Sequence, residues 1–176
     1  HPSSASPWFE LIMWPNDYSG TEAEMSIFPT KILLAMDGSE EATLAAQTAV
    51  DIADKTNSEL HVVYVESLDY GHLRFGEPDF EYRQQIEEKI EQKARKLLDA
   101  EVERVEVAGG RISEAHLSIG SPDNEIVKIS DEIGAGLIVI GSRGLGGIKR
   151  ALLGSVSDSV VRHAHCPVLV VREEKV

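Results

Sequence analysis

The sequence predicts an α/β protein built on a doubly wound, five-stranded parallel sheet in the order 3-2-1-4-5, with helices on both faces. Short, continuous apolar runs, typical of strands buried on both faces, alternate along the chain with longer segments in which apolar residues recur at helical spacing. This alternation predicts parallel strands joined by helices, and right-handed crossovers favour a doubly wound, Rossmann-like sheet. The 176 residues suit one domain rather than two.

The first strand and its helix have the clearest signals. A continuous apolar run over 32–36 predicts a buried strand, which Asp37-Gly38-Ser39 ends. Ser39 is expected to cap the helix that follows, where apolar residues recur every four positions. A second strand is predicted at 60–65, and residues 66–78 are expected to be irregular.

The middle of the chain predicts two helices and one weaker strand. Apolar residues repeat at spacings of three and four between 86 and 105, which indicates a long helix that ends at Gly109-Gly110. Its many charged residues are interpreted as a solvated face. A third strand is predicted at 115–119, and the next helix starts at Ser121-Pro122.

The last third of the chain is rich in glycine. Gly134 is expected to close the preceding helix, and residues 137–140 form a fourth buried strand. A glycine-rich stretch covers 141–154, after which Ser155 is expected to cap a last short helix. The fifth strand is predicted at 168–171.

Charge and composition exclude several classes of protein. The formal net charge of −13 argues against a general nucleic-acid binder and against docking on an anionic membrane, because phosphate groups would be repelled. Cys166 is the one cysteine, so no internal disulfide is expected. No apolar run approaches the roughly 18 residues of a membrane span. Residues 1–30 contain no Lys or Arg, whereas a signal peptide begins with basic residues. A cytoplasmic protein is therefore predicted.

The first 26 residues differ from the rest. They mix Pro, Ser and Asn with both tryptophans and sustain no period, so 1–26 is predicted to be an N-terminal extension and 27–176 the domain. One interpretation is a disordered or added leader ahead of a native start at Met25 or Met13. The other is a segment that docks on the body or on a neighbouring subunit through its large apolar side chains. Those side chains are Trp8, Phe9, Ile12 and Trp14.

The topology itself predicts where a ligand binds. In a sheet of this order the first and fourth strands are neighbours, and the winding reverses between them. Asp37-Gly38-Ser39 follows the first strand and the Gly141 loop follows the fourth, so both should meet at the ligand-binding end of the sheet. Asp37 is accordingly a candidate ligand residue, with a turn or helix-cap role as the alternative.

The glycine-rich loop has the composition of a phosphate site. Glycines let the main chain approach a ligand, and the helix opened by Gly154-Ser155 favours an anion at its N-terminus. No Asp or Glu occurs from 133 to 157. The alternative is a flexible surface loop with solvated bases. The polar candidates are the hydroxyls of Ser155 and Ser157 and the cations of Arg143, Lys149 and Arg150.

Two standard nucleotide motifs do not fit. A P-loop needs G-x-x-x-x-G-K-S/T, and counting from Gly141 puts Gly147 where the lysine should be. The dinucleotide pattern G-x-G-x-x-G belongs after the first strand, where Asp37-Gly38-Ser39 stands instead. The acidic cluster and late lysine of a response regulator are not evident either.

The spacing of the loop glycines resembles another family. Gly141 and Gly144, then nine intervening residues and Gly154-Ser155, match the G-2x-G-9x-G-S/T pattern of the universal stress protein family. The chain is similar to that family from about Ile27 to Val171. The matching segments include 31–39, 152–157 and 166–171, and residues 1–26 lie outside the resemblance.

The resemblance implies ATP binding, because the intact glycine motif marks the members of the family that bind ATP. ADP or AMP is the alternative ligand. Mg²⁺ or Mn²⁺ would accompany the phosphates. Asp37, which follows Met36, would hold the ribose or, indirectly, the nucleotide-bound metal. Ala35 and Val65 would line the adenine pocket. Ribose and phosphates would follow Ile140, Gly141, Arg143 and Gly144, and the phosphates would rest on Gly154, Ser155, Val156 and Ser157. Some relatives have Pro in place of Ala35 and His in place of Arg143.

The resemblance also implies a homodimer through antiparallel pairing of the fifth strands at Val168–Val171. That strand is short, apolar and at the predicted edge of the sheet, so pairing would cover it.

Two classes of function remain: a nucleotide-dependent regulatory protein of the stress response with little turnover, or a slow ATPase or other nucleotide hydrolase. The loop offers donors and cations but no carboxylate that could act as a general base, which favours the first.

A short segment ahead of the fifth predicted strand carries two histidines and the cysteine. His163-Ala164-His165-Cys166 has metal-ligand residue types, but that spacing rarely gives tetrahedral geometry and no remote ligand pair is evident. Cys166 is interpreted as a small buried hydrophobe. No Ser–His–Asp or Cys–His arrangement is indicated by spacing.

Overall fold

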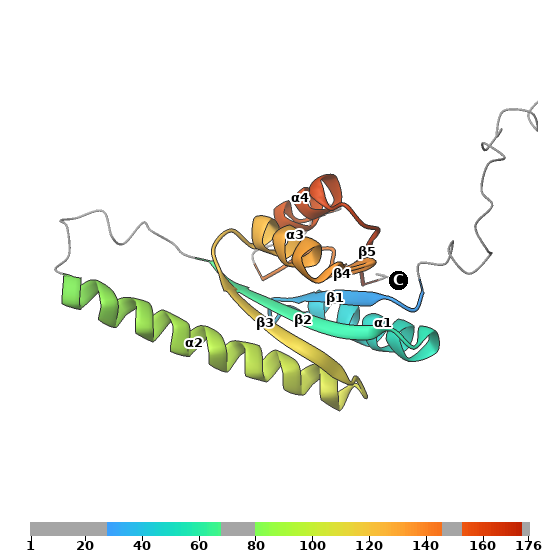
Figure 1. Cartoon of the computed structure of the whole chain (residues 1–176), viewed down its shortest axis with the longest axis horizontal. Coiled ribbons are helices and arrows are strands. Elements are labelled where there is room, and N and C mark those ends of the chain that lie inside the picture. Colours follow the sequence, from blue (N-terminus) through green and yellow to red (C-terminus); the bar gives the residue numbers. More distant parts are fainter. Residues whose placement is uncertain (1–27, 68–79, 146–152, 174–176) are drawn as a thin grey trace, which may run out of the picture.

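The computed structural model describes residues 28–67, 80–145 and 153–173, in which strands and helices alternate (Figure 1). The strands are β1 (Lys31–Met36), β2 (Glu59–Glu66), β3 (Ile112–Ile119), β4 (Leu137–Gly141) and β5 (Val168–Val171). The helices are α1 (Glu40–Thr56), α2 (Phe80–Val107), α3 (Pro122–Ile133) and α4 (Ser155–His163).

The five strands form one parallel sheet in the order β3-β2-β1-β4-β5, which confirms the predicted topology. β1 lies at the centre, with Ala35 opposite Val63 of β2 and Ile140 of β4. The winding therefore reverses between β1 and β4, as a sheet of this order requires.

Helices cover both faces of the sheet, with α1 and α2 on one side and α3 and α4 on the other (Figure 1). Alternate residues of the central strands feed the two resulting cores. Leu34 and Val139 belong to the core under α1, whereas Leu33 and Ile138 belong to the core under α3. All four side chains are completely buried, which explains why these strands read as unbroken apolar runs.

The helix ends follow their predicted signals, with one correction. Ser39 caps α1, since its Oγ accepts the Ala42 N–H at 3.1 Å, and Gly134 ends α3 at a φ of +64°. For α4, Gly154 is the cap and Ser155 the first helical residue, so the prediction that Ser155 is the cap is wrong by one position. The Gly154 N–H donates to the Ser142 carbonyl at 2.7 Å, which holds Gly154 outside the helix.

Two other boundaries differ from the sequence-based expectation. β3 begins at Ile112, three residues before the predicted start. The sequence missed these residues because Ser113 and Glu114 are polar and exposed on an edge strand, so the apolar pattern starts only after them. α2 begins at Phe80, ahead of its first periodic apolar residue. Within the described residues, no helix has the length and apolar character needed to cross a membrane.

The N-terminal extension 1–26 and nearly all of the segment expected to be irregular (66–78) lie outside the described residues. Glu66, at the start of that segment, is the last residue of β2. The assignment of 1–26 as an extension and of 27–176 as the domain stays a prediction.

Candidate functional site

Two loops meet beyond the carboxyl ends of β1 and β4, where the topology predicts a ligand site. The Leu145 N–H donates to Asp37 Oδ2 at 3.3 Å, and the Ser39 hydroxyl donates to the Arg143 carbonyl at 3.4 Å. Asp37 Oδ1 also accepts the Ser39 N–H at 3.0 Å, which fixes its carboxylate in the turn. The structure thus brings the Asp37 turn and the start of the glycine-rich loop into direct contact.

Two of the loop glycines are needed for close approach. A Cβ on Gly144 would collide with Asp37 Oδ2. A Cβ on Gly141 would lie 2.9 Å from the main-chain carbonyl carbon of Glu41, at the start of α1. A side chain at position 144 would therefore displace the Asp37 carboxylate, and one at position 141 would push the end of β4 away from the start of α1.

Glu41 of α1, which spacing did not indicate, is the main partner of the loop. It is buried, and its carboxylate accepts from Ser142 Oγ at 2.6 Å and from Arg143 Nε at 2.8 Å. Burial by itself raises the pKa of the Glu41 carboxyl, but the hydrogen bonds from Ser142 and Arg143 outweigh it and hold that pKa below its usual value. Glu41 is therefore an ionised, hydrogen-bonded carboxylate at neutral pH.

This ion pair changes the electrostatics expected of the loop. The stretch from 133 to 157 has no acid in sequence, but in space Glu41 balances the Arg143 guanidinium. The positive charge predicted for the phosphates from Arg143 is thus engaged with a carboxylate of α1. Residues 146–152, including the other two predicted cations, Lys149 and Arg150, lie outside the described part of the chain.

The N-terminus of α4 forms the third side of the site. The first N–H groups of an α-helix have no partner within the helix, and Gly154 has no side chain to accept from them. Ser155 is exposed there, whereas Ser157 is buried and its hydroxyl lies 2.8 Å from the Ser142 carbonyl oxygen, to which it donates. Main-chain N–H groups and the Ser155 hydroxyl are thus the donors that this helix presents outward.

The predicted apolar residues lie mainly on one face of the sheet. Ala35, Ile140, Val65 and Val156 all belong to the core on the α3 and α4 side, while Met36 packs into the opposite core. Ala35 and Ile140 are buried and Val65 and Val156 are partly exposed. These residues form an apolar wall next to the polar loops.

A second buried acid, Glu101 of α2, lies beside the turn after β1. Its Oε1 would be 3.5 Å from a Cβ added to Gly38 of that turn, and it is 3.3 Å from Arg104 Nη1. Its Oε2 has no partner among the described residues. Burial raises the pKa of the Glu101 carboxyl, and the nearby Asp37 charge adds to that rise while Arg104 opposes it. A signal did exist, since Glu101 shares the helical spacing of the buried Leu98 and Val105.

We expect Glu101→Gln to stabilise the protein at neutral pH by on the order of 1 kcal/mol, because a buried carboxylate with one unpaired oxygen becomes neutral. Because the pKa of Glu101 is raised in the folded state, the parent protein loses stability as pH rises through that pKa and regains it as pH falls. The stability advantage of the variant should therefore shrink at lower pH. Urea unfolding at several pH values measures this, with Glu103→Gln, an exposed change on the same helix, as the control. A variant less stable than the parent at pH 7 would contradict this expectation.

The His163–Cys166 segment does not form a metal cluster. His163 Nδ1 lies 2.8 Å from the Ser159 carbonyl oxygen, to which it donates, while His165 Nδ1 lies 3.0 Å from Asp131 Oδ2. Cys166 is half-buried against the core under α3, and burial raises the pKa of its thiol. The two histidines thus turn to different partners, and the raised pKa of the thiol disfavours the reactive thiolate.

Comparisons with known proteins agree on one family. The model of the universal stress protein family matches residues 29–172. A putative universal stress protein of Staphylococcus aureus (strain USA300) is 40% identical over 146 residues, which cover 82% of this chain and 84% of that protein.

Two solved structures extend the comparison to ligands. A universal stress protein of Archaeoglobus fulgidus in complex with dAMP is 26% identical, with a TM-score of 0.57 over 83% of this chain and 99% of its own. A universal stress protein in complex with cAMP is 25% identical, with a TM-score of 0.58 over 82% of this chain and 98% of its own.

Proposed function

The chain belongs to the universal stress protein family, and from that premise we propose that it binds an adenine nucleotide, ATP in the first place, and acts as a nucleotide-dependent regulatory protein of the stress response. The observation that carries the proposal is the junction of the Asp37 turn, the 141–145 segment and the N-terminus of α4 at the carboxyl ends of β1 and β4. Relatives solved with dAMP and cAMP support an adenine nucleotide as the ligand class.

In this proposal the base and the sugar lie on the β1 side. Ala35 and Val65 supply apolar contact to the adenine, and both belong to the same core face. The Asp37 carboxylate is partly exposed and accepts N–H groups from both loops, so it is held where it can accept a ribose hydroxyl or face a nucleotide-bound Mg²⁺ or Mn²⁺.

The phosphates would lie between the loop and α4. Gly141, Gly144 and the main chains of Ile140 and Arg143 line one side, and Gly154, Ser155, Val156 and Ser157 the other. Main-chain N–H groups at a helix N-terminus favour an anion even without a cationic side chain, so the pairing of Arg143 with Glu41 is compatible with phosphate binding. The Ser157 hydroxyl would have to leave the Ser142 carbonyl to reach a phosphate, which makes Ser155 the better donor.

Slow or absent turnover follows from the acids around the site. A hydrolase needs a general base or a residue that positions water near the phosphates. Among the described residues, Glu41 is bound to Ser142 and Arg143, and Asp37 accepts two main-chain N–H groups. Glu101, the third acid near the Asp37 turn, is only 3% exposed. None of the three carboxylates is placed to activate a water molecule at the phosphates, so we propose binding with little hydrolysis.

We also propose that two copies pair through β5 in the cytoplasm. β5 pairs with β4 on one side, and no strand of the described residues pairs with its other side. Its four residues are all partly exposed, and an unpaired apolar edge is covered when it pairs with a second copy.

Native mass spectrometry of the protein as purified tests both parts of the proposal. We expect the mass of a dimer with an adenine nucleotide bound, and calorimetry on nucleotide-free protein should give one ATP per chain. Asp37→Ala should weaken that binding because the ribose or metal contact is lost. Absence of any adenine nucleotide together with no ATP binding would overturn the proposal. Multiple-turnover hydrolysis that Asp37→Ala abolishes would assign a slow ATPase instead.

A further inference from the structure

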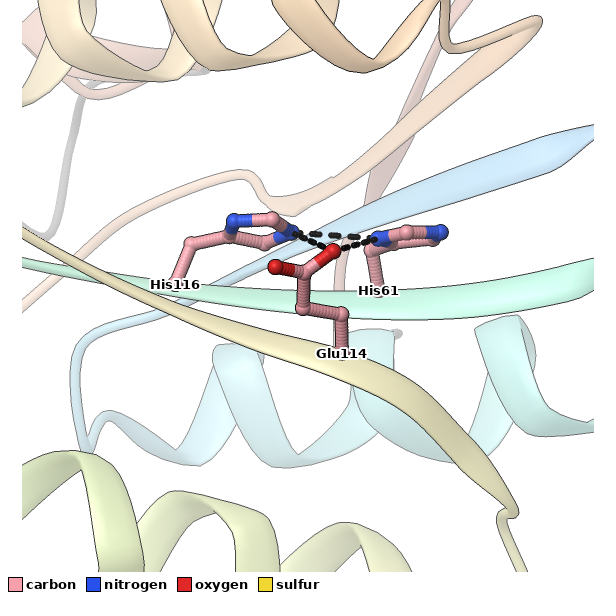
Figure 2. Close-up of side chains that lie close together, drawn as sticks. All are labelled: His61, Glu114 and His116. Atoms are coloured by element: carbon pink, nitrogen blue, oxygen red, sulfur yellow. Dashed lines mark hydrogen bonds and ion pairs between the residues drawn. The ribbon is translucent and has the colours of Figure 1, made fainter.

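Two histidines and a glutamate come together on the sheet, away from the nucleotide end. His61 of β2 lies beside Glu114 of β3, and His116 follows two residues later on the same face of β3. Figure 2 shows the three side chains pointing toward one another above the two strands. They lie in the amino-terminal half of β2 and near the middle of β3. The candidate nucleotide site, in contrast, lies beyond the carboxyl ends of β1 and β4.

The donor atoms converge on one point. His61 Nδ1 is 3.0 Å from His116 Nε2, and Glu114 Oε2 is 3.9 Å from the first and 4.0 Å from the second. Metal–nitrogen and metal–oxygen bonds of about 2.0–2.2 Å place tetrahedral ligand atoms roughly 3.3 Å apart, so small side-chain movements would seat an ion among the three. Glu114 is exposed and able to make that movement.

A fourth residue, Glu59, lies behind the His61 ring. Glu59 Oε2 lies 3.4 Å from His61 Nε2, on the side of the ring opposite His116. A carboxylate at this position favours a proton on His61 Nε2, so that His61 Nδ1 accepts the hydrogen bond from His116 Nε2–H. A bound ion would displace that proton and take both nitrogens as ligands. Metal-binding histidines usually have such an outer carboxylate, which orients the ring and increases its basicity.

The burial of the cluster is also that of a built site rather than a chance surface contact. His61 is 4% exposed, and its ring stacks on that of His116 with the centroids 5.3 Å apart. Glu114, in contrast, is exposed, so the cluster opens to solvent on one side. An ion could therefore enter from solvent and keep a water molecule in its fourth position.

We propose that His61, Glu114 and His116 bind one divalent transition-metal ion, with Zn²⁺ the best match to two imidazoles and one carboxylate. Mg²⁺ and Ca²⁺ prefer oxygen ligands and fit this donor set poorly. The ion would tie β2 to β3 at the edge of the sheet. This site is separate from the metal that would accompany a nucleotide, and it does not depend on the proposed nucleotide binding.

The test is metal titration of the full chain, stripped with a chelator and free of nucleotide and of any affinity tag. We expect one Zn²⁺ per chain by calorimetry, a higher melting temperature with Zn²⁺, and visible absorption bands of a tetrahedral site with Co²⁺. Glu114→Gln, an exposed change that should leave the fold intact, and His116→Asn should each weaken Zn²⁺ binding by about tenfold or more.

His165→Asn is the matched control, because it removes an exposed histidine that also pairs with a carboxylate, Asp131. It should leave the titration unchanged. Absence of stoichiometric Zn²⁺ binding would overturn the proposal. So would binding that Glu114→Gln and His116→Asn leave intact, or binding that His165→Asn abolishes. A folded His116→Asn protein that still gives the Co²⁺ bands would also overturn the proposal.

Discussion

Replacing Glu41 with glutamine is expected to destabilise the protein by about 3 kcal/mol, because the change leaves the Arg143 guanidinium without its buried carboxylate. Both side chains of the pair are about one-tenth exposed, so water replaces little of the lost interaction. Glutamine keeps the shape and one acceptor oxygen, which Ser142 Oγ and Arg143 Nε would then have to share. The loop after β4 should loosen from α1 first.

Equilibrium unfolding in urea measures the loss, and Glu40→Gln is the matched control. Glu40 is the neighbouring acid in the first turn of α1, but it is exposed. Both changes remove one negative charge near the positive end of the helix dipole, so the difference between them isolates the buried pair. A difference below about 1 kcal/mol, the size of an exposed pair, would show that Glu41 does not hold the loop.

Gly154→Val is expected to weaken adenine-nucleotide binding by about 100-fold while the protein stays folded. Gly154 has a φ of −76° and a ψ of 164°, an extended conformation that valine adopts easily, so the effect is one of space. A Cβ there would lie 3.4 Å from Arg143 Cα and from the Ser142 carbonyl oxygen. The two methyl groups of valine would have to displace this main chain, and losing two hydrogen bonds to a charged phosphate accounts for a factor of that size.

Calorimetry with ATP measures the affinity, and Gly154→Ala serves as the graded control. A single methyl group at 3.4 Å makes ordinary van der Waals contact, so alanine should retain most of the affinity. Both variants should stay folded, with the valine variant melting at a somewhat lower temperature because it displaces main chain. Unchanged affinity in the valine variant would place the phosphates elsewhere and remove the basis of the site.

The fold could be predicted because each of its signals is local. Buried parallel strands have continuous apolar runs, helices have a period near 3.6, and the topology rules order the strands without any knowledge of contacts. The same rules placed Asp37 and the Gly141 loop at one end of the sheet, where the structure joins them. The predicted cap of α4 is wrong, because the Gly154 N–H donates to the Ser142 carbonyl, a partner outside the helix that the local pattern does not show.

The site chemistry was harder to predict, because its partners are distant in sequence. The bond from Arg143 to Glu41 spans 102 positions, and no spacing rule links them. His61 and His116 face each other only through the pairing of β2 with β3, whose register shifts between Leu60 and His61. Glu101 could have been found, since a charged residue at a core position of α2 is a local signal that was interpreted as part of a solvated face.

The Ser142 carbonyl, which receives both the Gly154 N–H and the Ser157 hydroxyl, has an evolutionary consequence. One acceptor thus fastens the start of α4 to the residue that follows β4. The bond from the Gly154 N–H joins two main-chain atoms, so only a substitution that removes this N–H or moves the main chain breaks it. Selection can therefore change the side chain at position 142 without freeing the start of α4.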